Sequence, residues 1–289
     1  MKTQKKNLKR ILMIATGGTI ASKRSADGLK PLMTSEGLLG FVPHVKEFCE
    51  VTATQVINID STNIQPKHWL LISSTIEKYY DQFDGFVVCH GTDTMAYTAS
   101  ALSFMLENLR KPVIITGSQL PIGEVRTDGE ENLITALQIA AAVDPVNGEP
   151  MVQEVAILFE NYLWRGNRST KMSADNFNAF KSNNYPSLAR IGLSIQFNHD
   201  ALWRVHEKRP LNVHLGLNTD VIVIYVHPGL TEQSLRQQLD TPGVKGVVLK
   251  TYGAGNAPAC EWLNRPIKEA IDRGIVVVNV TQCVNGGVR

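Results

Sequence analysis

Residues 10–19 of the chain read RILMIATGGT, an apolar run that ends in two glycines with a threonine on either side. The apolar residues do not alternate with polar ones, so both faces of such a strand would be buried, as in a parallel sheet covered by helices. The paired glycines are typical of a turn. This stretch therefore predicts a buried parallel strand that opens into a polar loop.

The same pattern recurs along the first two thirds of the chain. Further strands are expected at residues 51–59, 85–89, 112–116 and 155–159, and helices at residues 66–80, 97–108 and 132–142. Strands that alternate with helices imply right-handed crossovers. The sequence thus predicts an α/β fold with a large, doubly wound and mostly parallel sheet.

A second, shorter α/β segment follows a polar, irregular stretch at residues 183–215. Strands are expected there at residues 221–226, 247–249 and 275–280, and helices at residues 231–239 and 262–273. We expect a large N-terminal catalytic domain over residues 1–192, a linker over 193–214, and a smaller C-terminal α/β domain over 215–289.

Composition narrows the function classes. The chain has 289 residues, 43% of them hydrophobic, and a net charge of only +2, which gives no electrostatic case for binding nucleic acid or an anionic membrane. The apolar run after the basic start is too short for a secretion signal or a membrane span, so we expect a cytoplasmic protein. The four cysteines lack metal-ligand spacing and are expected to be reduced thiols: Cys49, Cys89, Cys260 and Cys283.

Polar segments follow the ends of four predicted strands, at residues 16–19, 60–62, 90–94 and 117–119. Carboxyl ends of parallel strands meet at one edge of a sheet, so these segments should share one site. They are rich in hydroxyls, and a hydroxyl needs an adjacent base or relay to become a nucleophile. A lysine beside Asp93 could supply that relay, and Lys171 is the candidate, although a surface position for Lys171 is equally consistent with its place in the sequence.

Other chemistry-bearing motifs do not fit. The glycines after the first strand lack the dinucleotide-binding GxGxxG pattern, and the chain contains no phosphate-binding GxxxxGK sequence, so no cofactor and no metal are expected. Residues 117–121 do not form the GxSxG nucleophile elbow, which weakens Ser118 as a nucleophile. His90 is more readily explained as a packed residue that supports its turn than as a catalytic one.

Several motifs then resemble one family. Residues 15–22, ATGGTIAS, and residues 90–95, HGTDTM, look like the two signatures of bacterial L-asparaginases. Segments 116–119, 165–171, 252–258 and 274–283 also match, in the family's order. The long match over residues 92–109 is similar to the cytoplasmic type I enzymes.

The resemblance implies a role for each matching residue in hydrolysing L-asparagine to aspartate and ammonia through a covalent acyl-enzyme. Thr19, on a mobile loop, matches the nucleophile, and Thr92, Asp93 and Lys171 match a second catalytic cluster. Residues 60–62 match the segment that holds the substrate's α-carboxylate and α-amine, together with Asp93. The implied substrate-binding set is Asp60, Ser61, Thr62, Thr92, Asp93 and Ser118. The order in which Thr19 and Thr92 act stays open, and some activity on glutamine is compatible with this set.

Two departures from the family pattern concern assistance and regulation. A tyrosine that often follows the mobile loop is replaced by Leu29. The type I enzymes carry a regulatory asparagine site between subunits, of which Thr170 and Cys283 match two positions, while Lys250 stands in place of an arginine and lacks its bidentate fork. The resemblance also implies a homodimer or homotetramer.

The family normally continues for several tens of residues past the position of Arg289, so we expect uncovered apolar surface on the second domain. Two alternatives remain at this point. One is a catalytically impaired, truncated member that only binds asparagine. The other is the asparaginase-like subunit of a tRNA-dependent amidotransferase, which usually carries an extra N-terminal domain, whereas the first signature here begins at Ala15.

Overall fold

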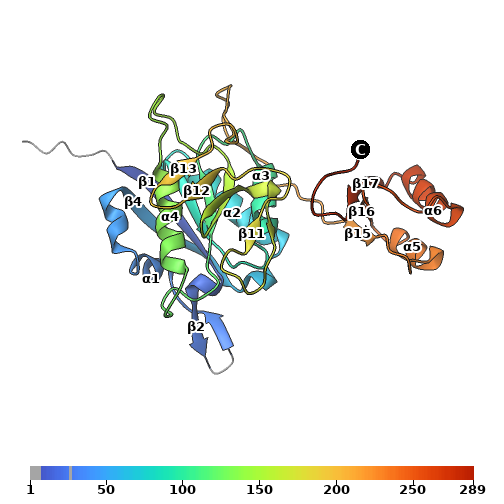
Figure 1. Ribbon diagram of the computed structural model, residues 1–289, viewed down its shortest axis with the longest axis horizontal. Helices are drawn as coiled ribbons and strands as arrows, with labels where there is room; N and C mark the ends of the chain where they lie inside the picture. The colour runs from blue at the N-terminus through green and yellow to red at the C-terminus, as the bar shows by residue number, and fades with distance from the viewer. Residues whose placement is uncertain (1–7, 26–27) are drawn as a thin grey trace, which may run out of the picture. The chain divides into compact units, whose positions relative to one another are not determined.

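A computed structural model describes residues 8–25 and 28–289 of the chain. The chain divides into two compact units, the first ending at Leu215 and the second beginning at Gly216 (Figure 1). Each unit has a sheet and a hydrophobic core of its own.

The first unit is built on one eight-stranded sheet with the order β13-β12-β9-β8-β7-β5-β1-β4. Neighbouring strands from β4 to β8 run parallel, and β9, β12 and β13 continue the sheet in antiparallel pairs. The strands are β1 (Lys9–Gly17), β4 (Cys49–Ile59), β5 (Gly85–Cys89), β7 (Val113–Thr116), β8 (Val155–Phe159), β9 (Tyr162–Arg165), β12 (Ala189–Ile191) and β13 (Ile195–Phe197).

Helices cover both faces of this sheet. The helices are α1 (Ser35–Leu39), α2 (Pro66–Tyr79), α3 (Met95–Met105) and α4 (Gly129–Ala141). Successive residues of β1 point to opposite faces, so Met13 lies in the core beneath α1 and α4, whereas Leu12 and Ile14 lie in the core beneath α2 and α3. Burial on both faces explains the unbroken apolar runs, and the predicted α/β class with a mostly parallel sheet is confirmed.

The chain changes direction across the sheet between β1 and β5. From β1 the chain passes to β4 on one side, and from β5 it passes to β7 on the other side. The loops that leave the carboxyl ends of β1 and β5 therefore begin at a topological switch point, which is where open α/β sheets bind ligands. These two loops carry Thr19 and Thr92.

The stretch expected to be irregular contains regular structure. Residues 189–191 and 195–197 form β12 and β13 of the main sheet, and β14 (Asn212–Val213) pairs with β6 (Leu106–Glu107). The segment expected as a linker, 193–214, thus belongs largely to the first unit. Strands of two or three residues are too short to show a period of two, so the sequence pattern did not reveal them. Two further hairpins pair β2 (Ser22–Ser25) with β3 (Gly28–Pro31) and β10 (Thr170–Lys171) with β11 (Phe180–Lys181).

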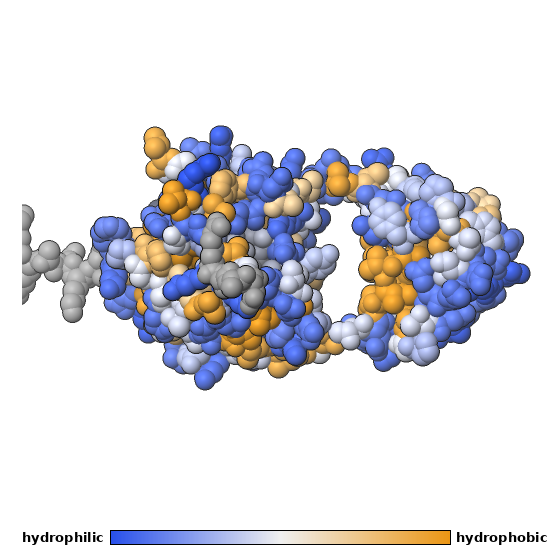
Figure 2. Space-filling model, turned by 90° about the horizontal axis from the view of Figure 1, so that it is seen from below, coloured by the Kyte–Doolittle hydropathy of each residue, from blue (hydrophilic) through white to orange (hydrophobic). Residues whose placement is uncertain are grey.

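The second unit is a three-stranded parallel sheet with the order β15-β16-β17. Its elements are β15 (Val221–Tyr225), α5 (Glu232–Leu239), β16 (Gly246–Thr251), α6 (Glu261–Asp272) and β17 (Val276–Thr281). Both helices pack against one face through Leu235 and Leu263. The other face exposes a row of apolar side chains, and Figure 2 shows apolar residues gathered on this unit. They are Val221, Val223, Tyr225, Val276 and Val278.

Candidate active site

Thr19 is held at the end of β1 by two glycines with positive φ. It begins the 3₁₀ turn η1 (Thr19–Ala21) directly after Gly17 (φ 102°) and Gly18 (φ 78°), and it is half-buried. A Cβ on Gly18 would lie 2.3 Å from the backbone nitrogen of Gly91, which leads into Thr92. Only glycine permits this contact and this backbone conformation together, and the contact brings the Thr19 and Thr92 loops against each other.

The three predicted members of the second cluster do lie together. Lys171 Nζ donates to Thr92 Oγ1 at 2.8 Å and to Asp93 Oδ1 at 2.7 Å. The Lys171 side chain is 19% exposed and that of Asp93 is 54% exposed, so the ammonium is sheltered while the carboxylate faces solvent. Lys171 is therefore not an isolated surface lysine, and one positive charge contacts both the hydroxyl of Thr92 and a carboxylate.

Lys171 lies on β10, and the segment that leads to it, residues 166–171, runs antiparallel to α3 from near its end toward its beginning. The chain leaves β9, forms the 3₁₀ turn η4 (Gly166–Arg168), and packs closely on α3, where a Cβ on Gly166 would lie 2.9 Å from Ser103 Oγ. Thr92 and Asp93 stand just before the first residue of α3. A segment distant in sequence thereby meets the end of β5.

Gln119 is a member of the site that sequence analysis missed. Its Oε1 accepts a hydrogen bond from Thr92 Oγ1 at 3.3 Å, and its Nε2 donates to the carbonyl of Asn176 at 2.9 Å. Thr92 Oγ1 therefore accepts from Lys171 and donates to Gln119. The sequence feature that could have indicated this contact is the position of Gln119 in a polar segment directly after a predicted strand.

Asp60 follows β4 and caps the 3₁₀ turn η3 (Ser61–Asn63), which lies beside the same loops. Asp60 Oδ1 accepts from the backbone nitrogen and the hydroxyl of Thr62, both at 2.8 Å. Ser61 is buried, its carbonyl accepts from Thr94 Oγ1 at 2.7 Å, and a Cβ on Gly91 would lie 2.6 Å from its Oγ. Loops from β1, β4 and β5 thus meet around Gly91.

Ser118 lies in the turn that follows β7. It is buried, and its hydroxyl donates to the carbonyl of Leu120 in the same turn. The preceding Gly117 packs on the backbone of His90, because a Cβ there would lie 2.1 Å from the His90 carbonyl oxygen. The turn therefore contacts the Thr92 loop through backbone as well as through Gln119.

His90 has the supporting position that its sequence context favours. It is fully buried, its Nδ1 donates to the Gly91 carbonyl at 2.7 Å, and its Nε2 accepts from Thr98 Oγ1 at 2.9 Å. Trp69 Nε1 in turn donates to Thr98 at 2.9 Å. Burial lowers the pKa of His90 to about 4, so the ring is neutral at physiological pH.

The residues that match the regulatory positions fall in different units. Thr170 is exposed on β10 of the first unit, where it pairs with Lys181. Lys250 of the second unit lies over the ring of Tyr225 at 5.1 Å, and the exposed Cys283 follows β17. Leu29, at the position where a tyrosine often assists, is 48% exposed on β3. Among residues 8–25 and 28–289 no group of three or more histidines, cysteines or carboxylates could hold a metal ion.

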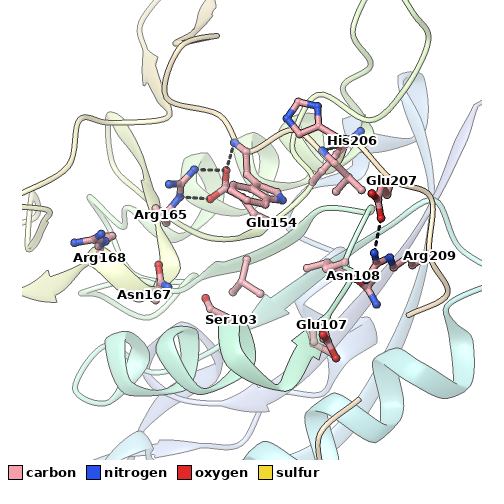
Figure 3. Close-up of a pocket in the computed structure, with 16 residues that line it drawn as sticks. Ser103, Glu107, Asn108, Glu154, Arg165, Asn167, Arg168, His206, Glu207 and Arg209 are labelled. Atoms are coloured by element: carbon pink, nitrogen blue, oxygen red, sulfur yellow. Dashed lines mark hydrogen bonds and ion pairs between the residues drawn. The ribbon is translucent and has the colours of Figure 1, made fainter. Parts of the chain in front are cut away.

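A cavity of about 640 Å³ lies at the other end of α3 and contains none of the predicted catalytic residues (Figure 3). Its wall carries paired charges: Arg165 Nε contacts Glu154 Oε2 at 2.5 Å, and Arg209 contacts Glu207. With its main charges already satisfied, and with the threonines elsewhere, this cavity is not the reaction site.

Two family models match the chain. The model "Asparaginase, N-terminal" covers residues 10–203, and the model "Glutaminase/Asparaginase C-terminal domain" covers residues 220–289. Together they span most of both units.

The chain is also similar to individual proteins. L-asparaginase 1 of Escherichia coli K12 is 44% identical over 97% of this chain and 81% of its own length. The crystal structure of L-asparaginase I from Vibrio cholerae superposes with a TM-score of 0.85 at 42% identity, covering 97% of this chain and 84% of that one. A glutamyl-tRNA(Gln) amidotransferase component from Pyrococcus furiosus is 34% identical over 98% of this chain and 65% of its own length.

In the described part of the chain, no helix is both long and apolar enough to cross a membrane. Two threonine-bearing loops meet at the switch point of a parallel sheet, a lysine joins one of them to a carboxylate, and both family models match in order. The chain therefore belongs to the asparaginase family, and its resemblance to the type I enzymes is confirmed by the 44% identical relative.

Proposed function

We propose that this chain hydrolyses the side-chain amide of L-asparagine to L-aspartate and ammonia, with Thr19 as nucleophile and Thr92, Asp93 and Lys171 as its proton relay. The observation that carries the proposal is the position of Lys171 Nζ, within 2.8 Å of Thr92 Oγ1 and 2.7 Å of Asp93 Oδ1. A positive charge beside a hydroxyl favours loss of the hydroxyl proton, and the carboxylate keeps the ammonium in place.

In the first step Thr19 Oγ bonds to the amide carbon. The hydroxyl proton is transferred to the amide nitrogen, the C–N bond breaks, and ammonia leaves from an aspartyl ester on Thr19. Backbone N–H groups of the Thr19 and Thr92 loops supply donors for the transient oxyanion, and the loss of one such donor typically costs roughly 3 kcal/mol.

In the second step water attacks the ester carbon. Thr92, with its hydroxyl held by Lys171, takes part in removing one water proton, and that proton returns to Thr19 Oγ as the ester bond breaks. Aspartate then leaves, and the site is restored. The geometry is equally compatible with the opposite order of action of Thr19 and Thr92.

Substrate recognition rests on polar groups of the loops that converge on Gly91. Residues 60–62 and the exposed carboxylate of Asp93 provide partners for the α-carboxylate and α-amine, and the Ser118 turn faces the side-chain amide. A site that hydrogen-bonds both ends of an amino acid discriminates strongly against analogues that lack one group. Glutamine adds only one methylene, so slower hydrolysis of glutamine fits the same site.

The proposal is tested by coupled ammonia release with asparagine and with glutamine across a concentration series. Loss of a covalent nucleophile typically lowers kcat by roughly 10⁴-fold or more, which is the result expected for Thr19→Val. Thr75→Val, on α2, is the matched control and should leave kcat unchanged, because the Thr75 hydroxyl bonds the carbonyl of Leu71 in its own helix. Ammonia release near the wild-type rate from Thr19→Val would refute the assignment.

The same assay separates the alternatives. A catalytically impaired member would bind asparagine, as measured by calorimetry, without releasing ammonia. An amidotransferase component would release ammonia productively only with its partner and tRNA-bound glutamate. The higher identity and fuller coverage of the asparaginase relatives favour the free enzyme.

We further propose a cytoplasmic homodimer or homotetramer, with regulation by asparagine through Thr170, Lys250 and Cys283. Sedimentation equilibrium tests the assembly. A sigmoidal dependence of rate on asparagine would support the regulation, and a hyperbolic curve at every enzyme concentration would refute it.

A further inference from the structure

The turn at residues 117–120 reaches the proposed catalytic threonine through Gln119, yet it follows a strand of only four residues. So short a strand supplies few contacts to hold the turn, and its conformation therefore depends on hydrogen bonds from neighbouring elements. Two side chains of the neighbouring helix supply that support: Asp128, which precedes the first residue of α4, and Asn132, one turn further on.

Asp128 binds the turn through its backbone. Its two carboxylate oxygens lie 2.9 and 3.0 Å from the backbone nitrogen of Gln119, and Oδ1 also accepts from the backbone nitrogen of Leu120 at 3.1 Å. The residue is only 7% exposed. Two successive N–H groups directed at one buried carboxylate fix the orientation of the peptide that carries the Gln119 side chain.

Asn132 holds the other end of the turn. Its Nδ2 donates to the Gly117 carbonyl at 3.0 Å and to Asp128 Oδ2 at 3.2 Å, and its Oδ1 accepts from the backbone nitrogen of Glu160 at 2.9 Å. It is 1% exposed, so these bonds do not exchange with water. Together Asp128 and Asn132 bond three of the turn's backbone groups and connect it to the end of β8.

The Gln119 side chain is fixed at both ends as a result. Asp128 fixes its backbone, and the Asn176 carbonyl fixes its Nε2, which leaves Oε1 directed at Thr92 Oγ1. The hydroxyl hydrogen of Thr92 then points at Gln119 while its oxygen accepts from Lys171. Residues 60–62 leave a different strand and are held by hydrogen bonds within their own turn and from Thr94, so a change at Asp128 should leave them in place.

We infer that Asp128 and Asn132 are positioning residues for catalysis. Their hydrogen bonds to the backbone of residues 117–120 fix the conformation of the turn, and this conformation directs Gln119 Oε1 at the hydroxyl of Thr92. This inference rests on the proposed function, in which Thr92 takes part in proton transfer. It predicts that loosening the turn impairs the chemical step and leaves substrate binding largely intact.

The test is steady-state kinetics on Asp128→Asn, which retains size and one acceptor oxygen but places an amide against the Asn132 amide. Misplacement of a reacting group by about 1 Å costs on the order of 100-fold, so we expect kcat to fall roughly 10- to 100-fold while KM stays within about threefold. Asp144→Asn is the matched control, because Asp144 is also a buried carboxylate that binds a loop nitrogen, that of Val146 at 2.9 Å. It should change kcat less than about twofold.

A second variant keeps the inference testable if Asp128→Asn does not fold. Gln119 is only half-buried, so Gln119→Leu removes the acceptor for Thr92 without disturbing the anchors, and kcat should again fall. Since Asp128 acts through Gln119, the double variant should lose no more than the worse single variant. Unchanged kcat in Gln119→Leu, fully multiplicative losses in the double variant, or an equal loss in Asp144→Asn would overturn the inference.

Failure of the proposed function is separable from failure of this inference. Thr92→Val tests the former directly, because a fully active Thr92→Val enzyme removes Thr92 from the chemistry. If Thr92→Val is inactive and Asp128→Asn retains the wild-type kcat, only the positioning role is wrong.

Discussion

Replacement of Lys171 by methionine removes one ammonium from the proposed site and retains most of the side chain's apolar length. In the structure this ammonium donates to Thr92 at 2.8 Å and to Asp93 at 2.7 Å. Lys171→Met therefore separates the charge of the relay from the packing of β10 against α3.

The expected loss of activity is large. General acid–base groups typically contribute roughly 10²- to 10⁴-fold to a rate, which corresponds to about 3–5 kcal/mol of activation free energy. Without the ammonium, Thr92 has no adjacent charge to assist loss of its proton, and Asp93 loses the partner that fixes its orientation. We expect kcat to fall by at least about 100-fold.

The expected loss of stability is small. The Asp93 side chain is 54% exposed, so water replaces the lost ion pair on that side, and such pairs contribute about 1 kcal/mol or less. The predicted rise in activation free energy thus exceeds the predicted loss of unfolding free energy by about 2 to 4 kcal/mol. A merely structural lysine would give the reverse relation.

Ammonia release and thermal unfolding should be measured on the same preparations. Lys181→Met is the matched control, because Lys181 is exposed on the strand that pairs with β10, whereas the ammonium on Thr92 and Asp93 is that of Lys171. It should retain activity within about twofold. If Lys171→Met keeps more than about a tenth of the wild-type kcat, the relay proposed from the structure is refuted.

Three other perturbations follow from the structure. Gly18→Ala would place a Cβ 2.3 Å from the backbone nitrogen of Gly91, on a residue whose φ is 78°. We expect loss of ammonia release and a loss of at least about 2 kcal/mol in the free energy of unfolding by denaturant. A fully active and stable variant would contradict the close contact between the loops. The pKa of His90 is about 4 in the folded chain, below its unfolded value of about 6.5. As the pH falls from 6.5 to 4, protons therefore bind preferentially to the unfolded chain, and the folded state loses up to about 3 kcal/mol of stability. A His90→Gln variant should lack this pH-dependent loss when unfolding by urea is followed at several pH values. Burial raises the pKa of the Cys49 and Cys89 thiols to about 12, whereas Cys283 is exposed, so a thiol reagent should label Cys283 in the folded chain, and reaction of Cys49 or Cys89 before unfolding would contradict the structure.

The sequence predicted the buried strands better than any other part of the fold. The expected ranges of β5 and β8 agree with the structure at both ends, since every residue of these strands is buried and apolar burial is visible in the sequence. The hairpin of β2 and β3 was not predicted, because its short and mostly polar strands, SKRS and GLKP, carry no apolar period. The antiparallel strands β12 and β13 were missed because three residues are too few to define a period.

For the site, the sequence predicted which loops would meet but not how their side chains pair. Convergence of strand ends is a property of topology, so it follows once the strands are recognised. The position of Lys171 depends on the antiparallel return of residues 166–171 along α3, for which the sequence gives no periodic signal. Sequence position alone therefore left Lys171 as a candidate no more favoured than a surface lysine, and the resemblance then assigned it to the site. Gln119 was overlooked because its contact with Thr92 depends on the orientation of a turn that Asp128 holds from another element.

The backbone contact between Gly18 and Gly91 explains how the two threonine-bearing motifs come to lie together. β1 and β5 are adjacent, and their loops leave in opposite directions, so the loops would separate unless their first turns touched. A side chain at either glycine would collide with the neighbouring loop, with Gly91 in one case and with Ser61 in the other. The glycines therefore set the separation between Thr19 and Thr92, and the lysine and glutamine contacts then fix the direction of the Thr92 hydroxyl. In the proposed site, the relative position of the two threonine loops is determined by backbone packing at a topological switch point, and the orientation of the Thr92 hydroxyl by side chains from elsewhere in the chain.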